Sequence, residues 1–139
     1  MNKVFLIGRT ATDPNIVITK TGKKLATFKL AVHREFKNAE GIRETDFLRI
    51  AAWEGKADVV ERNLTKGRLI CVEGSIQVST YPGSDNTARV SYEINCKGIE
   101  FLDPNPFKNT NQNHVPIKDL PTKEPAIPPT VPPINPSDK

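Results

Sequence analysis

Residues 45–53 of this chain separate, with a strict period of two, into two sets of unlike character. In an extended strand, successive side chains point to opposite faces, so the alternation predicts a strand with two unlike faces. Small Ala51 leaves room on the outward face. The inward face collects Leu48, Ile50 and Ala52, and the outward face collects Phe47, Arg49 and Trp53.

The same period recurs in residues 24–34, where Ala26, Phe28, Leu30 and Val32 face inward. Residues 3–10 carry apolar side chains on both faces, which predicts a strand covered on both sides. Further strands are expected over residues 16–19, 68–80 and 88–96. Between them the period changes, and the spacing of Ala57, Val60 and Leu64 predicts a short helix over residues 54–66.

This order of elements predicts an all-β fold with one short helix, the five-stranded Greek-key barrel of the OB-fold. All eight glycines lie between Gly8 and Gly98, whereas ten of the twelve prolines lie from Pro104 onward. Proline at that density removes backbone donors and favours extended conformers. We therefore expect a folded domain over residues 1–103 and a disordered Pro-rich tail over residues 104–139.

The charge balance is only mildly positive, with a net charge of +4 over 139 residues. Such a surplus permits an anionic partner without requiring one. The early apolar run at residues 4–7 is too short for a signal peptide, and no later run approaches a membrane span, so we expect a cytoplasmic protein with no membrane partner. Cys71 and Cys96 predict free thiols, and neither a metal site nor a cofactor is expected.

An OB-fold would expose four of the aromatic side chains. Aromatic rings beside cations are the groups that stack on unpaired bases and neutralise their phosphates. The candidate stacking residues are Phe36, Phe47, Trp53 and Tyr81. The candidate phosphate contacts are Lys24, Lys29, Arg34, Lys37, Arg43, Arg49 and Lys56. The remaining rings, Phe5, Phe28, Tyr92 and Phe101, align with inward residues and are expected in the core.

The residues leave other interpretations open. Phe47 and Trp53 would show the same alternation if they packed beneath a second sheet or a subunit. An OB-fold adaptor of the primosome type could use the same rings to bind a protein, with little DNA affinity of its own. A nuclease is a third possibility, although the chain shows no catalytic motif and no inward cluster of acidic residues. We therefore expect a protein that is not an enzyme.

From residue 1 to about 102 the chain resembles the bacterial type of single-stranded DNA-binding protein. The matching motifs are Asn2-Lys3-Val4, Gly8-Arg9, Asp13-Pro14, Ala26-Thr27-Phe28, Leu30-Ala31-Val32, Arg43-Glu44-Thr45-Asp46-Phe47, Leu64, Lys66-Gly67, Val72-Glu73-Gly74 and Phe101-Leu102. The family's stacking positions fall on the same four aromatic residues. The resemblance implies a homotetramer that binds and protects single-stranded DNA in replication, recombination and repair.

The chain departs from the family pattern in two places. Gln77, Ser79 and Thr80 are neutral where the family is commonly basic. The sequence also finishes on Pro136-Ser137-Asp138-Lys139, whereas family tails usually end with an acidic run and Pro-Phe that recruits replication and repair proteins. The tail is therefore not expected to recruit them, and the resemblance is to an accessory, plasmid or phage member.

Overall fold

We describe the protein from a computed structural model, which defines residues 1–105. The predicted disordered tail lies outside the described residues, apart from its first two. The elements in chain order are β1 (Val4–Thr10), β2 (Asn15–Ile18), β3 (Lys24–His33), β4 (Thr45–Trp53), α1 (Gly55–Asn63), β5 (Leu69–Pro82) and β6 (Ala88–Phe101).

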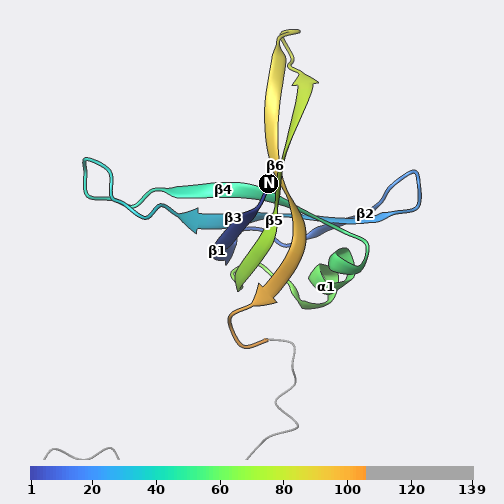
Figure 1. Cartoon of the computed structure of the whole chain (residues 1–139), viewed down its shortest axis with the longest axis horizontal. Helices are drawn as coiled ribbons and strands as arrows, with labels where there is room; N and C mark the ends of the chain where they lie inside the picture. Colours follow the sequence, from blue (N-terminus) through green and yellow to red (C-terminus); the bar gives the residue numbers. More distant parts are fainter. Residues whose placement is uncertain (106–139) are drawn as a thin grey trace, which may run out of the picture. The chain divides into compact units, whose positions relative to one another are not determined.

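Five of the strands close into a barrel. The sheet order is β1-β5-β6-β4-β3, and β1 pairs with β3 as well as with β5, so no free edge remains between the first and last strands. Only β4 and β6 pair in parallel, and the short β2 extends the sheet beside β3 (Figure 1). This arrangement confirms the predicted five-stranded OB-fold barrel with one short helix.

Closure of the barrel depends on a glycine in β1. Where β1 crosses β3, a Cβ atom on Gly8 would lie 2.2 Å from the carbonyl oxygen of Ala31. No side chain fits at that distance, so only glycine lets the two backbones approach closely enough to pair. Arg9, the next residue of β1, is the register partner of Ala31, so Gly8 lies directly beside the point where the two strands pair.

The core lies inside the barrel, with α1 covering its open end. Ala57 and Val60 are fully buried and Leu64 is 3% exposed, which confirms the apolar face predicted for the helix. The helix starts at Gly55, one residue later than predicted, because Glu54 has a φ of 52° that a helix cannot include. The inward residues predicted for β3 and β4 are buried or partly buried around the same core.

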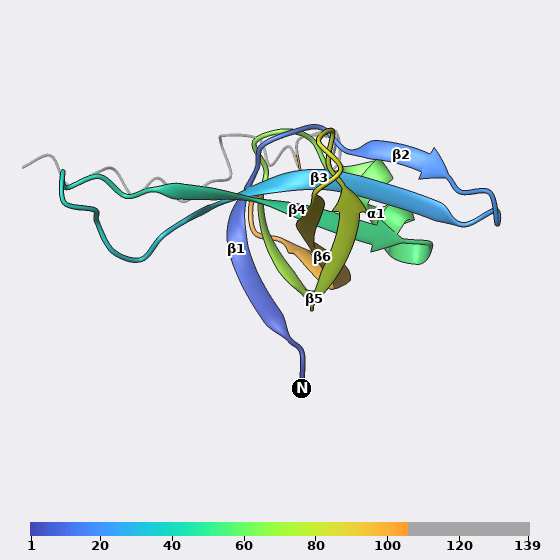
Figure 2. The same ribbon diagram turned by 90° about the horizontal axis from the view of Figure 1, so that it is seen from above.

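Two segments extend from the barrel. The outer parts of β5 and β6 form a projecting hairpin, residues 75–95, and the connection between β3 and β4 extends as a second arm (Figure 1). Seen from above, this arm and the β2–β3 turn point in opposite directions from the barrel (Figure 2). The arm and the β2–β3 turn therefore continue the line of β3 and β4 past the barrel, and the hairpin projects in another direction (Figure 1).

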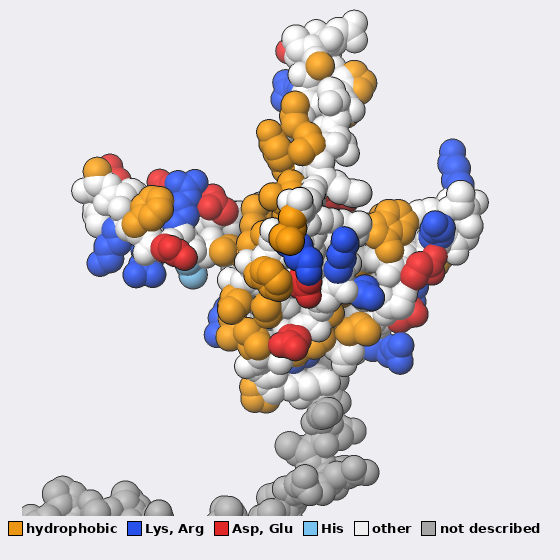
Figure 3. Space-filling view, viewed as in Figure 1, with side chains coloured by type: hydrophobic (Ala, Val, Ile, Leu, Met, Phe, Trp, Pro, Cys, Tyr) orange, Lys and Arg blue, Asp and Glu red, His pale blue; other side chains and the backbone are white. Residues whose placement is uncertain are grey.

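Two rings expected in the core are exposed. Phe5 is 66% exposed because none of residues 1–105 packs on the outward face of β1, so within the described residues the prediction that residues 3–10 are covered on both sides is wrong. Tyr92 is 67% exposed because the projecting hairpin extends past the core that its apolar face would contact. Hydrophobic side chains consequently gather on the surface over β1 and along the hairpin (Figure 3).

The other predicted buried groups are found as expected. Phe28 is 3% exposed, and Phe101 packs against the core cluster. Cys96 is buried and Cys71 is half-buried, and both are free thiols. Burial raises the pKa of the Cys96 thiol. Within residues 1–105, no helix is long and apolar enough to cross a bilayer, and no group of three potential metal ligands is present.

A buried arginine connects the start of β5 to the residues that follow β6. The Arg68 side chain is 3% exposed, and its Nε and Nη2 donate hydrogen bonds of 3.0 and 2.9 Å to Oδ1 of Asp103. Its Nη1 donates to the carbonyl of Asn63 at 2.7 Å, and the guanidinium lies 4.3 Å from the Phe101 ring centroid. The backbone N–H of Leu69 donates to the other Asp103 oxygen.

Candidate nucleic-acid interface

The outward face of β3 and β4 carries two of the predicted stacking residues. Phe47 is 62% exposed, and Trp53 is half-buried on the same face of the same strand. Six residues of extended strand place their Cα atoms about 20 Å apart. The two rings therefore flank a stretch of outward face long enough to accommodate more than one nucleotide.

Register pairs between the strands define that stretch. Lys29 lies directly opposite Arg49, and Thr27 lies opposite Ala51. Ala51 is only 1% exposed, because β3 flanks it on one side and β6, through Asn95, on the other. It forms the floor between the rings, which agrees with the room that its small side chain was expected to leave.

Phe36 lies on the arm between β3 and β4 and is 72% exposed. The arm is ordered by its own hydrogen bonds, because the Asn38 side-chain oxygen accepts from the backbone N–H groups of Glu40 and Ile42. Gly41 provides the left-handed conformation of this turn, with a φ of 78°. The ring is thus presented on a structured loop rather than packed on the barrel.

Arg34 braces the base of that arm. Its Nε and Nη2 donate hydrogen bonds of 3.0 Å to the two oxygens of Asp46, and its Nη1 pairs with Glu44. The hydrogen bonds from Arg34, and then its charge, hold the pKa of Asp46 below its usual value. Arg34 was predicted as a phosphate contact, and the structure gives it two carboxylate partners instead of leaving it free.

Lys24 is held on the other side of the sheet. Leu25 faces outward opposite Trp53, so the preceding residue, Lys24, faces the other way. Its ammonium pairs with Asp58 at 2.9 Å and with Glu61, both on α1. The hydrogen bonds to these carboxylates raise its pKa. The ammonium thus ties β3 to the helix and does not lie beside the rings.

Tyr81 lies on the projecting hairpin and is 48% exposed. Its register partner is Arg89, and the alternation places both on the same hairpin face as Glu93. Glu93 accepts a 2.6 Å hydrogen bond from Nε of Arg49, which links this hairpin face to the outward face of β4. The exposed cation at Arg89 escaped the sequence analysis, because only the register reveals that it lies beside Tyr81.

The other predicted cations are exposed. Within the part of the chain that the structure defines, none of them forms an ion pair. They lie on β3, on the arm and after Trp53, and they are Lys29, Lys37, Arg43 and Lys56. Of the seven predicted phosphate contacts, these four form no ion pair with a described residue, whereas Lys24 and Arg34 each pair with two carboxylates and Arg49 pairs with Glu93 through Nε alone.

A hollow of about 270 Å³ lies beside Lys29 and Arg49 and was not anticipated. Thr12, Asn15 and Thr27 contribute polar side chains to its lining. Thr12 lies in the loop before β2, Asn15 on β2 and Thr27 on β3, so no local period in the sequence links these three residues. The sequence signal for this hollow was the presence of polar residues near the Asp13-Pro14 turn. Polar residues are so common in turns that this signal does not identify a binding site.

Comparison with known proteins places these features in a family. The model of the "Single-strand binding protein family" matches residues 1–102. The chain is 39% identical to Single-stranded DNA-binding protein 1 of Staphylococcus aureus (strain COL) over 81% of its own length and 66% of that protein. It is also 39% identical to the Single-stranded DNA-binding protein of Bacillus cereus, over 75% of this chain and 61% of that one.

A solved structure gives the same relationship. The chain matches the structure described as "Plasmodium falciparum SSB complex with ssDNA" with a TM-score of 0.67 and 30% identity. The match covers 74% of this chain and 96% of that one. By contrast, the chain spans about two thirds or less of the length of the two bacterial relatives.

Proposed function

Because the chain belongs to the single-strand binding protein family, we propose that it binds and protects single-stranded DNA and acts in replication, recombination and repair. The observation that carries this proposal is the outward face of β4, where Phe47 and Trp53 flank Arg49. Unpaired bases expose flat faces, and the rings offer matching surfaces without reading sequence. Each stacked base contributes about 1–3 kcal/mol.

The four rings occupy different parts of the same side of the protein in this proposal. Phe47 and Trp53 hold bases on the barrel, Phe36 extends the path onto the arm, and Tyr81 extends it onto the hairpin. A strand of DNA is flexible enough to follow such a path, because its single bonds are not constrained by pairing. Binding is therefore expected to tolerate any base.

The exposed cations supply the phosphate contacts. We assign this role to the four unpaired cations named above and to Arg49, whose contact with Glu93 uses Nε alone, and we assign Lys24 and Arg34, which each pair with two carboxylates, to stabilising the fold. Each neutralised phosphate contributes a slope of about −0.7 to the plot of log K against log salt concentration. Binding by stacking and charge neutralisation requires no cofactor and no catalysis.

The exposed apolar side of β1 supports self-association. Phe5 and Ile7 are 66% and 59% exposed on one strand, an unusual exposure for a protein that acts as a single chain. We propose that a second copy of the chain covers them in a homotetramer. Mass measurement in solution tests this part, and a monomer at micromolar concentration would contradict it.

Fluorescence of Trp53 tests the binding directly, because it is the only tryptophan. Titration with oligothymidylate at low salt should quench its emission, and a duplex of the same length should have a much smaller effect. The adaptor alternative predicts a different result, in which Trp53→Ala and Phe47→Ala disturb a protein complex and leave DNA affinity unchanged. A single-stranded oligomer that alters neither emission nor mobility would refute the proposal.

A further inference from the structure

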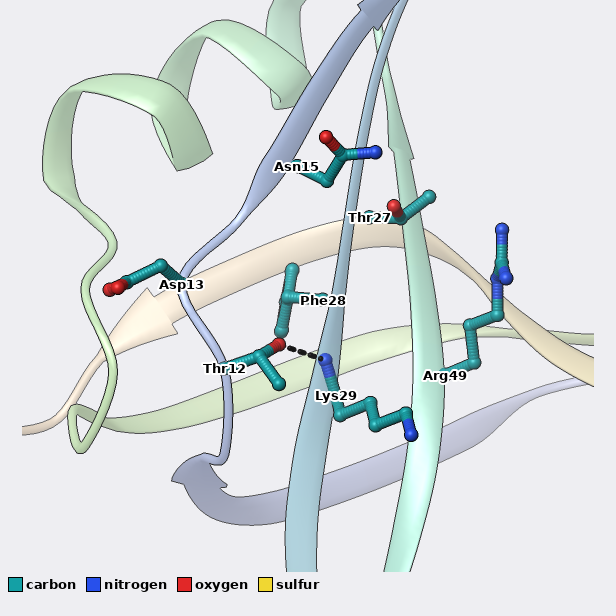
Figure 4. A pocket seen from close by; sticks show the side chains of 7 residues that line it. All are labelled: Thr12, Asp13, Asn15, Thr27, Phe28, Lys29 and Arg49. Atoms are coloured by element: carbon teal, nitrogen blue, oxygen red, sulfur yellow. Dashed lines mark hydrogen bonds between the residues drawn. The ribbon is translucent and has the colours of Figure 1, made fainter.

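The hollow beside Lys29 and Arg49 has the chemistry of an anion site. Figure 4 shows its lining, with Lys29 and Arg49 on adjacent strands and Asn15 next to Thr27. The register pairs Lys29 directly with Arg49, and Asn15 directly with Thr27. Two rows of side chains on the outward face, one cationic and one neutral, thus border the same space.

The cationic row places two like charges on neighbouring strands. Like charges directly opposite each other on neighbouring strands destabilise a sheet. Glu93 offsets part of this repulsion through Nε of Arg49, whereas Lys29 makes no ion pair with any residue of the described chain. An anion bound between the two side chains would remove the remaining repulsion.

No carboxylate is directed at this space from the lining. Asp13 is the acidic residue among the lining side chains, and its Oδ1 accepts a 2.9 Å hydrogen bond from the backbone N–H of Lys66. Its carboxylate accordingly points away from the other residues (Figure 4). The arrangement keeps negative charge out of the hollow.

The neutral side chains supply further donors. Thr12 Oγ1 accepts a 3.1 Å hydrogen bond from the backbone N–H of Lys29, which leaves its hydroxyl hydrogen available (Figure 4). The side chains of Asn15 and Thr27 make no hydrogen bond to any other residue in the range 1–105. Hydroxyl and amide groups of this kind are common partners of phosphate oxygens.

We infer that this hollow is a phosphodiester subsite, in which Lys29 and Arg49 bind the charge of one phosphate and Thr12, Asn15 and Thr27 donate hydrogen bonds to its oxygens. The inference rests on the proposed function and adds a defined position to it. The Lys29–Arg49 row lies between the rows of Phe47 and Trp53. The subsite therefore holds the backbone between two stacked bases, and neutral donors contribute to it.

Because the subsite includes uncharged donors, substitutions in it should affect the affinity and its salt dependence differently. Thr27→Val and Asn15→Ala should each weaken binding about tenfold, as expected for a hydrogen bond to a charged group. The salt slope should not change, because neither side chain releases a counterion. Lys29→Gln should instead reduce the magnitude of the slope by about 0.7. Each variant should be measured with fluorescein-labelled oligomers of dT, dC and dA of equal length.

The three oligomers separate a phosphate contact from a base contact. A phosphate is common to all of them, so the loss for Thr27→Val should be the same factor on each. Thr80→Val and Lys97→Gln are matched controls, because both residues are exposed and lie off the outward face of β3 and β4, and they should bind like the original chain. Thermal unfolding should show that every variant is folded.

Two results would overturn the subsite. Unequal losses on the three oligomers would mean that Thr27 or Asn15 contacts a base edge, and unchanged affinity in both variants would mean that the hollow is unused. Failure of the proposed function gives a different result, since the unsubstituted chain would then bind none of the oligomers.

Discussion

The Arg68–Asp103 contact at the end of the barrel should determine a large part of the domain's stability. Asp103→Ala removes the carboxylate but leaves the guanidinium 3% exposed and 4.3 Å from the centroid of the Phe101 ring. Removing one partner of a buried ion pair costs about 3–5 kcal/mol. The Asp103 side chain is 25% exposed, so we expect the lower end of that range, about 3 kcal/mol.

Urea unfolding followed by circular dichroism measures this loss at matched protomer concentration. The midpoint should fall with little change in the m-value, since the surface exposed on unfolding stays similar. Glu73→Ala is the control, because its partner Lys3 is 3.0 Å away but the two side chains are 40% and 52% exposed. An exposed pair of that kind contributes about 0.2–1 kcal/mol. A loss below about 1 kcal/mol for Asp103→Ala would refute the reasoning.

The pH dependence provides a second test of the same contact. Burial raises the pKa of Asp103, but hydrogen bonds from Arg68 and Leu69 and the charge of Arg68 outweigh it, so the pKa lies below its model-peptide value of 3.8. A lowered folded-state pKa stabilises the protein above the unfolded value and loses that effect as the pH falls through the folded value. The difference between the original chain and Asp103→Ala should thus be constant near neutral pH and shrink below pH 3.8.

Three other substitutions follow from particular geometries. Glu54→Gly should stabilise the protein by about 1 kcal/mol, since the φ of 52° and ψ of −118° strain a residue with a Cβ; an unchanged melting temperature would contradict this. Tyr81→Ala should weaken oligothymidylate binding about tenfold, while Tyr92→Ala, on the opposite face of the hairpin, should not; equal losses in a filter-binding assay would argue against the assigned face. Gly8→Ala should abolish cooperative thermal unfolding because its Cβ would meet a carbonyl oxygen at 2.2 Å, whereas Gly55→Ala meets nothing within 4 Å and should unfold normally.

The strands and helix that form the core could be predicted because their signal is local. Phe28, Ile50 and Val60 recur with the period of their own element, and each is buried as that period indicates. The prediction failed for Phe5 and Tyr92, although Ile7 on the face of Phe5 and Val90 and Ile94 on the face of Tyr92 are also apolar. Alternation separates two faces of a strand but does not state which of them another element covers.

The candidate site was predictable to a different extent. The outward position of Phe47 follows from alternation, and the structure places it there. The pairing of Arg34 with Asp46 and of Lys24 with Asp58 did not follow, because the partners are separated by 12 and 34 residues in sequence. Whether a cation is free for a phosphate depends on such tertiary contacts.

The central claim is that rings on the outward face of β4 bind unpaired bases, and a comparison of Phe47→Leu with Phe5→Leu tests it most directly. Both rings are similarly exposed, at 62% and 66%, and leucine retains apolar surface while removing the π-face. With the mass in solution unchanged, Phe47→Leu should weaken oligothymidylate binding about tenfold at low salt, and Phe5→Leu should bind like the original chain. Equal affinity of Phe47→Leu and the original chain would contradict the account.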